Sequence, residues 1–472
     1  MEEKKKVDTL TEGSIIKSII FLTIPIIIGN LLQSMYQLTD AFWVGRLGAD
    51  AFASVSLCTP IIFLIIALTG GVGLAGGVLV SQYKGRKDHE KVNFVTGQTL
   101  VIATFLSIIS SLIGYYFAPQ IISLFGAEPA VFNNAVSFLR ISFLGMVFVF
   151  GYAVYQSLAR AVGDVKTPIY IVFGTVLLNF LLDPLFIFGW KFIPAIGVGG
   201  AALATMFTQA IAFFIGIFIL SKGEKGIHLK TKHLKPDFSL MKKIIFLGIP
   251  VSLEQSSRSV GMILMTGIVA GFGTIVLASY GIGGQMIMLV IIPALSLSIA
   301  NSTLVGHNIG AGKIERAEKI SKISTVLGFI VLSVIGVLMF IFANQIISTF
   351  IPGDTAVINE GTRYIRVMAL AFGLMGIQMS ILGTLRGSGN VSTTMKLTLT
   401  VIIVQVLSGF ILSKYILHNE LGVYLSMPIS TIVGATLALI VFFKGNWKDK
   451  KLIESKEVKE KIKEECQIAD CE

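Results

Sequence analysis

The sequence is poor in charged residues. Only 14% of its 472 residues are Asp, Glu, Lys or Arg, whereas soluble domains carry about 25%. Hydrophobic residues make up 54% of the chain, and the mean hydropathy is +0.82. This composition excludes a soluble globular protein. It predicts an integral membrane protein of the all-α class.

Several chemical motifs are also missing. The three cysteines, Cys58, Cys466 and Cys471, form no C-x-x-C pair, so neither a disulfide framework nor a zinc site is expected. No G-x-x-x-x-G-K-[ST] phosphate loop occurs, which argues against ATP-driven transport. H-E-x-x-H and nucleophile-elbow motifs are absent too. We therefore expect no enzyme and no organic cofactor.

Apolar segments of membrane-spanning length recur along the whole chain. A span needs about 20 mostly apolar residues. The first is too long for the apolar region of a signal peptide, and no cleavage motif follows it. We predict about twelve spans, near residues 19–45, 51–83, 94–120, 131–159, 167–190, 198–221, 241–270, 276–310, 320–349, 358–386, 391–417 and 421–444.

The net charge of +11 is unevenly distributed between alternate loops. Residues 83–91, 159–166, 221–243 and 310–319 and the tail from Lys444 are rich in Lys and Arg, whereas the intervening loops carry almost none. Basic loops of membrane proteins stay in the cytoplasm. The pattern predicts a multi-pass protein of the cytoplasmic (inner) membrane with both termini in the cytoplasm. It does not indicate a nucleic-acid surface.

The two halves of the chain repeat each other. LVSQYKG (79–85) matches LVGHNIG (304–310) at an offset of 225, and RAVGDVKT (160–167) matches RGSGNVST (386–393) at 226. Six spans per repeat is an even number, so we expect parallel repeats that form two six-helix lobes around a central cavity. The predicted parts are a cytoplasmic tail (1–18), a first lobe (19–221), an inter-lobe loop (222–240), a second lobe (241–444) and a C-terminal tail (445–472).

The first span carries an acid, Asp40. Gln33, Tyr36, Gln37 and Asp40 follow i, i+3, i+4, i+7 spacing and share one helical face. An acid within a span costs about 2.5–3.5 kcal/mol and usually faces the interior of the bundle. We interpret Asp40 as a proton or cation site and the other three residues as substrate contacts. The structural alternative is an interfacial or capping acid.

The fifth span carries a second acid. Asn179 and Asp183 lie four residues apart on one helical face, and Pro184 follows them. We expect Asp183 at the depth of Asp40, where two carboxylates with Asn179 and Thr205 would suit H⁺ or Na⁺. Repeat symmetry supplies no equivalent acids in the second half, which favours function. The alternative is that each acid is hydrogen-bonded for structural reasons.

The seventh span carries a polar cluster. Glu254 lies four residues before Arg258, in the order that favours an ion pair. Two interpretations remain open for Glu254. It is neutralised by Arg258, or it lines the cavity with Gln255 and contacts a cationic substrate. Gln285 is a further candidate substrate contact.

The motifs resemble those of the multidrug and toxic compound extrusion (MATE) transporters. Resemblance implies twelve helices in two lobes and a monomer that exports drugs or organic cations in exchange for H⁺ or Na⁺. The acids of the first lobe look most like the DinF-like branch, and the tenth span lacks the acid of the NorM-like branch. The similarity is carried by Pro25, MYQLTDAFWVGRLG (35–48), LVSQYKG (79–85), ARAVGDVKTP (159–168), NFLLDP (179–184), GVGGAALAT (197–205) and STLVGHNIGAGKIERA (302–317).

Two other functional classes compete with an antiporter. A lipid-linked oligosaccharide flippase has a similar two-lobed plan, but it should show a more basic cavity than these spans provide. A receptor or intramembrane enzyme could use Asp40 and Asp183 as a catalytic pair, yet the duplicated lobes favour transport.

Overall fold

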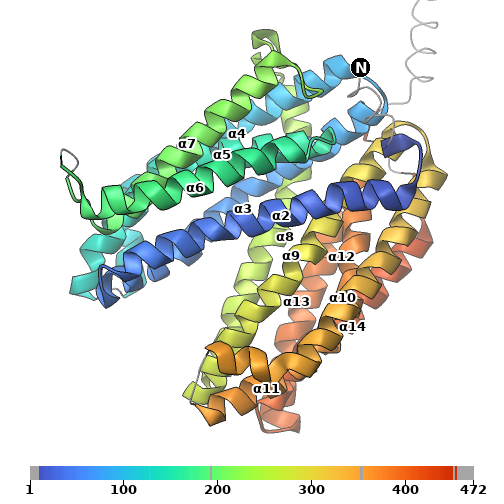
Figure 1. The fold of residues 1–472 in the computed structure, drawn as a ribbon. Coiled ribbons are helices and arrows are strands. Elements are labelled where there is room, and N and C mark those ends of the chain that lie inside the picture. Colours follow the sequence, from blue (N-terminus) through green and yellow to red (C-terminus); the bar gives the residue numbers. More distant parts are fainter. Residues whose placement is uncertain (1–9, 127, 192–193, 351–353, 450–451, 454–472) are drawn as a thin grey trace, which may run out of the picture.

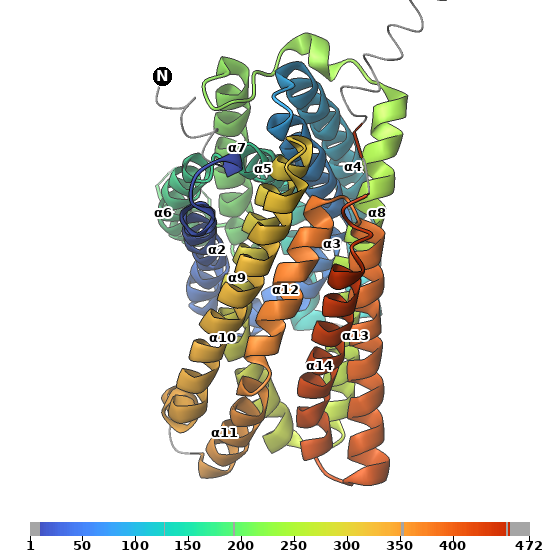
Figure 2. The ribbon, with the colours of Figure 1, turned by 90° about the vertical axis from the view of Figure 1, so that its right-hand side faces the viewer.

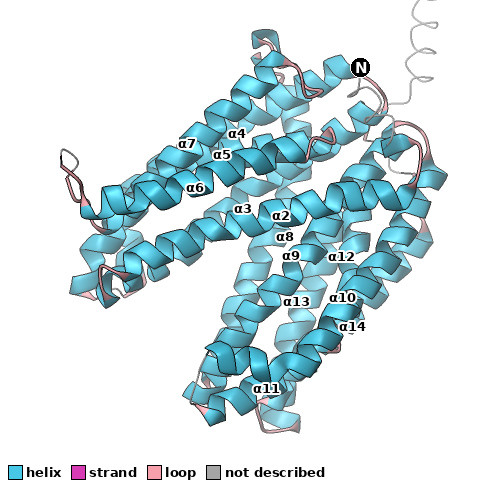
Figure 3. Ribbon diagram, in the orientation of Figure 1, coloured by secondary structure: helices cyan, strands magenta, loops and turns pink. Residues whose placement is uncertain are grey.

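The computed structural model describes residues 10–126, 128–191, 194–350, 354–449 and 452–453. Regular structure in these residues is α-helical, and no β-strand occurs among them (Figure 3). Cys466, Cys471 and most of the two predicted tails lie outside the described residues. The all-α membrane class predicted from composition is confirmed.

The helices form two bundles that follow the repeat (Figure 1). The loop between them holds a short 3₁₀ helix, η1 (Thr231–Leu234), and α8 begins three residues before the predicted second lobe. The first lobe contains α2 (Ile15–Gly45), α3 (Ala49–Gly85), α4 (His89–Leu124), α5 (Pro129–Ala161), α6 (Lys166–Phe188) and α7 (Val198–Lys222). The second contains α8 (Phe238–Ala270), α9 (Thr274–Gly310), α10 (Ile314–Phe350), α11 (Thr355–Ala369), α12 (Phe372–Gly387), α13 (Val391–Ile411) with its π-helical extension η2 (Leu412–Ile416), and α14 (Leu421–Lys444).

Ten of the described helices are long and apolar enough to cross a membrane, and α11 with α12 would make an eleventh span. The remaining helix, α8, is 33 residues long but carries Glu254 and Arg258 near its middle. Length and composition therefore support ten or eleven spans among the described helices, and α8 stands where the sequence predicts the remaining one.

One predicted span is not a single helix. The segment 358–386 was expected to be continuous, but α11 and α12 meet at a bend of 50°. After the bend, α12 packs its glycines closely against α10. A side chain at Gly376 would collide with the carbonyl group of Gly328. The bend is thus followed by a close backbone contact between α12 and α10, and the apolar pattern alone indicates neither feature.

The lobes contact each other where α3 crosses α8 and α9 (Figure 2). The contact between α3 and α9 is reciprocal. A Cβ atom at Gly85 would collide with the carbonyl oxygen of His307, and one at Gly310 would collide with that of Gln82. Gly85 and Gly310 are equivalent in the repeat, as are Gln82 and His307, so the crossing is nearly two-fold symmetric.

Hydrogen bonds reinforce this lobe contact. Gln82 Nε2 donates to the carbonyl of Gly387 at 3.0 Å, and His307 Nε2 lies 2.6 Å from the carbonyl oxygen of Ala161. Both contacts lie near the end of the molecule that carries the Lys- and Arg-rich loops, here called the basic-loop end. Toward the opposite end the two bundles diverge (Figure 1).

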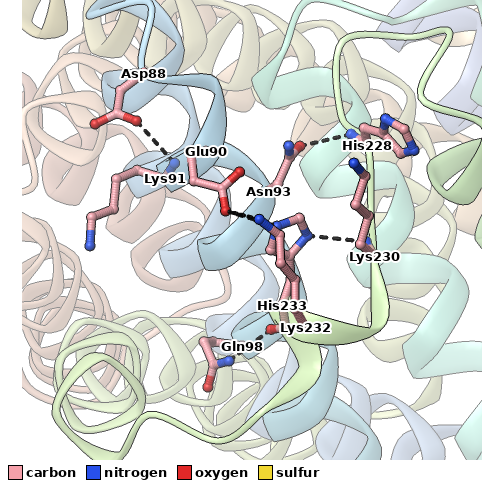
Figure 4. A network of polar contacts seen from close by, with 9 residues as sticks. All are labelled: Asp88, Glu90, Lys91, Asn93, Gln98, His228, Lys230, Lys232 and His233. Atoms are coloured by element: carbon pink, nitrogen blue, oxygen red, sulfur yellow. Dashed lines mark hydrogen bonds and ion pairs between the residues drawn. The ribbon is translucent and has the colours of Figure 1, made fainter.

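Hydrogen bonds hold the inter-lobe loop against the first lobe. Gln98 on α4 is buried, and its amide donates to the carbonyls of His233 and Lys235 at 2.9 and 2.7 Å. The Asp237 N–H donates a hydrogen bond to Gln98 Oε1 at 2.9 Å. Glu90 accepts from Lys232 at 2.7 Å at the exposed rim of this network (Figure 4). The loop thus packs on α4 up to the start of α8.

Candidate functional site

Three helices of the first lobe bring the four predicted cation-site residues together. Asp40 lies on α2, Asn179 and Asp183 on α6, and Thr205 on α7. The Thr205 hydroxyl is 3.3 Å from both carboxylate oxygens of Asp40. The Asn179 amide is 3.3 Å from Thr205 Oγ1 and 3.2 Å from Asp183 Oδ1. A hydrogen-bonded chain therefore links the two acids across three helices.

The sequence of α6 positions its polar pair. Asn179 and Asp183 are four residues apart, so both project from one face of α6, and both are buried. Pro184 lies inside the helix and has no N–H to donate to the carbonyl of Phe180, one turn earlier. That carbonyl therefore lacks the helical N–H partner that residue 184 would otherwise supply.

Two oxygens of the cluster are unsatisfied. Asn179 and Asp183 are 0% exposed, yet Asn179 Oδ1 and Asp183 Oδ2 accept no hydrogen bond from any described residue. Buried polar atoms normally have a partner. Hard cations such as Na⁺ bind oxygen ligands, and a proton held between carboxyl groups would satisfy the same atoms. The donor set suits a monovalent cation or a proton.

A transition-metal site is not indicated. Within the described ranges, no group of three or more His, Cys, Asp and Glu side chains could hold a metal ion. The cluster has two acids, an amide and a hydroxyl, whereas structural zinc sites use four Cys or His ligands.

The predicted substrate contacts occupy different environments. Gln33 and Gln37 on α2 are exposed, and so are Gln255 on α8 and Gln285 on α9. Tyr36, in contrast, is 4% exposed and packs within the hydrophobic core of the first lobe. In this structure the four glutamines are accessible to a ligand and Tyr36 is not. Their role as substrate contacts stays a prediction.

Glu254 is covered by positive charge. It is 1% exposed, and its Oε1 accepts from Arg258 at 3.2 Å, Arg386 at 2.5 Å and Thr398 at 3.3 Å. The ion pair with Arg258 that the spacing suggested is present. With two arginines around one carboxylate, Glu254 offers no free negative charge to a cationic substrate in this structure.

Sequence reasoning missed Arg386. It lies on α12, 132 residues from Glu254, and also donates from Nη1 to Ser298 Oγ at 3.3 Å. A signal was available in the repeat, because Arg386 aligns with Arg160 in the matching segments RGSGNVST and RAVGDVKT. An arginine retained near the same helix end in both halves should have been expected to meet a partner there.

Comparison with known families accounts for this architecture. The MatE family model matches the chain twice, over residues 25–185 and 250–411, with starts separated by the repeat offset of 225. The two matches together span well over half of the chain. The protein belongs to the MATE family. The family resemblance proposed from its motifs is thereby confirmed.

Curated relatives extend along nearly the whole MATE chain. A Bacillus subtilis protein named "Probable multidrug resistance protein YoeA" is 31% identical over 94% of this chain and 96% of its own length. The multidrug export protein MepA of Staphylococcus haemolyticus is 28% identical over 92% of this chain and 94% of its own length. These relatives are transporters, so the MATE protein described here is a transporter rather than an enzyme.

A solved structure supports the same fold. The crystal structure of a MATE protein in the bent conformation matches with a TM-score of 0.87 at 24% identity, covering 93% of this chain and 97% of that chain. The similarity confirms the two-lobed MATE architecture.

Proposed function

We propose that this MATE protein exports drug-like organic cations and amphipathic compounds in exchange for H⁺ or Na⁺. The observation that carries the proposal is the buried chain Asp40–Thr205–Asn179–Asp183 with its two unsatisfied oxygens. Drug export is supported by the names of the curated relatives. The second lobe lacks equivalent acids, since Met265 stands 225 residues after Asp40. Coupling is therefore assigned to the first lobe.

Helix α2 gives the cation site a connection to the second lobe. Asp40 lies on α2, which packs against α9, and Asn30 on α2 donates to Ser296 Oγ on α9 at 3.1 Å. A cation bound between Asp40 and Asp183 would offset one of their two negative charges, reduce the repulsion between the carboxylates and draw α2 toward α6. That movement changes the α2–α9 contact, so cation binding and lobe separation are coupled in this mechanism.

We assign the basic-loop end to the cytoplasm, because Lys- and Arg-rich loops are retained there. Both termini are then cytoplasmic, and the protein works as a single chain in the cytoplasmic membrane. With that orientation, the lobes meet on the cytoplasmic side and diverge toward the outer side. This is the arrangement of an exporter ready to release its substrate outward.

The test is efflux of ethidium, an organic dye cation, from proteoliposomes. A pH gradient and a Na⁺ gradient are imposed separately on the wild type, Asp40→Asn and Asp183→Asn. Asp50→Asn is the matched control, because Asp50 is an exposed acid in the first turn of α3. We expect one gradient to drive efflux in the wild type and the control, and neither acid variant to respond.

Two results would overturn parts of this proposal. Gradient-driven efflux by Asp40→Asn at the wild-type rate would exclude the first-lobe acids as the coupling site. No efflux under either gradient by folded wild-type protein would shift the assignment to a lipid-linked oligosaccharide flippase. Transfer of a labelled lipid-linked oligosaccharide in the same vesicles would then identify that activity.

A further inference from the structure

Both lobes carry an arginine at the same repeat position near the basic-loop end, but among the described residues only the second lobe has a carboxylate to pair with it. Arg160 and Arg386 are separated by 226 residues and occupy the same place in the repeat. Gly29 stands 225 residues before Glu254. In the second lobe, Arg386 and Glu254 form an ion pair at 2.5 Å. In the first lobe, the position of that carboxylate is taken by a glycine.

A pocket lies where the first lobe lacks the carboxylate. It is formed by α2, α5 and α6, and its walls include Gly29, Gln156, Arg160 and Val172. Val172 is the repeat equivalent of Thr398, which donates to Glu254 in the second lobe. The pocket therefore lies at the repeat position of the contact between Glu254 and Thr398 in the other half.

The pocket has room for an added group at Gly29. A Cβ atom there would meet Ile169 Cγ1 at 3.6 Å, an ordinary van der Waals distance. Many other glycines in this fold are different, because their hydrogen atom lies directly against a neighbouring helix. Close packing thus does not explain the glycine at position 29.

Arg160 faces this pocket without a carboxylate partner. Its Nη2 donates to Gln156 Oε1 at 2.9 Å, a neutral amide, and no ion pair of Arg160 with Asp or Glu occurs in the described part of the chain. Arg160 is half-buried on α5, where an uncompensated charge is costly. The planar guanidinium group suits a carboxylate, which accepts two parallel N–H bonds from it.

We propose that the Arg160 pocket binds the carboxylate group of an amphipathic compound that the transporter exports. The incoming carboxylate takes the place that Glu254 holds beside Arg386 in the second lobe. The protein then has a site for acidic and zwitterionic compounds that is separate from the Asp40–Asp183 cluster. The origin of the ligand rests on the export function proposed above, whereas its chemical class rests on the pocket.

Equilibrium binding to the purified protein in a neutral detergent tests the proposal. The probes are dansylglycine and dansylglycinamide, which differ in one negative charge, and binding is followed by dansyl fluorescence. We expect the wild type to bind the acid at least about tenfold more tightly than the amide, the size of one charge-assisted hydrogen bond. Equal binding of the two probes would overturn the proposal.

Two variants locate the site, and a third is the control. Gly29→Glu builds the missing carboxylate into the pocket, where it pairs with Arg160, so the preference for the acid should disappear. Arg160→Gln should remove the preference as well, while Gly174→Ala on α6 should keep it, because a Cβ at Gly174 meets no atom within 4 Å and lies outside the pocket. A folded Gly29→Glu protein that still prefers dansylglycine would overturn the proposal even if Arg160→Gln failed to fold.

Competition separates an exported compound from a membrane lipid. Unlabelled N-octanoylglycine should displace dansylglycine from the wild type. Displacement by short-chain phosphatidylglycerol but not by N-octanoylglycine would show a lipid head-group site and overturn the assignment to an exported acid. The titration needs no ion gradient, so its failure leaves cation-coupled export intact. Failure of ethidium efflux likewise leaves the binding result interpretable.

Discussion

The hydroxyl of Thr205 on α7 lies 3.3 Å from each carboxylate oxygen of Asp40 on α2, and it accepts from the Asn179 amide. A single side chain thus connects the acid of α2 to the polar pair of α6. Because a hydroxyl has one proton, Thr205 donates it to Asp40 and accepts the Asn179 N–H with a lone pair of its oxygen. The hydrogen bonds therefore run in one direction, from the Asn179 amide to the Thr205 hydroxyl and from that hydroxyl to the Asp40 carboxylate.

Replacing this hydroxyl should weaken cation binding. Thr205→Val keeps the shape of the side chain but removes a bond to a charged group worth about 1.5–3 kcal/mol, so the affinity for the coupling ion should fall about tenfold or more. The measurement is the ion concentration that gives half-maximal ethidium efflux. Thr205→Ser, which keeps the hydroxyl, should resemble the wild type. An unchanged ion dependence in Thr205→Val would show that the bridge has no part in coupling.

Neutralising Glu254 should destabilise the second lobe. Glu254→Gln leaves Arg258 and Arg386 without their carboxylate, and breaking a buried pair costs about 3–5 kcal/mol. The apparent melting temperature in detergent should drop clearly. The double variant Glu254→Gln/Arg386→Gln should melt above the single variant, because it leaves fewer uncompensated charges. A single variant as stable as the wild type would contradict the assigned pairing.

The reciprocal glycine contact should control closure at the basic-loop end. Gly85→Ala or Gly310→Ala puts a methyl group against the backbone of the opposite lobe, and overpacking of this kind costs about 1–3 kcal/mol. The lobes should therefore separate there more often. Gly267→Ala is the control, because a Cβ at Gly267 meets no atom within 4 Å.

Thiol labelling measures this separation. In a background with its own cysteines replaced by serine, Ser81→Cys places a thiol in the lobe contact, since Ser81 is 1% exposed beside Gly306. A membrane-impermeant maleimide should label it faster in Gly85→Ala than in Gly267→Ala. Equal rates would mean that the crossing of α3 and α9 does not limit access.

The bonds of Gln98 should hold the inter-lobe loop on α4. Gln98→Leu removes three hydrogen bonds from a buried position, so trypsin should cut sooner at Lys230 and Lys232. Lys232→Gln removes an exposed ion pair, which is worth at most about 1 kcal/mol, and should change little. Resistance of Gln98→Leu equal to that of the wild type would show that other contacts hold the loop.

Local sequence determines much of the fold of this protein. Apolar segment length fixes the number of spans, because unsatisfied backbone groups in lipid leave only helices of membrane length. The four-residue spacing of Asn179 and Asp183 fixes their common face, because the helical repeat does so in any surroundings. The constant offset of 225–226 residues predicts two lobes, because similar sequences fold into similar units.

Only the tertiary structure decided which distant side chains meet. Nothing in the spacing of α8 indicates that Arg386, 132 residues later, shares Glu254 with Arg258. The bend between α11 and α12 accompanies close glycine packing of α12 on α10, and the pocket beside Arg160 lies against Gly29 on another helix. Such features depend on how helices are placed against one another. Helical periodicity describes one helix at a time and carries no information about its neighbours.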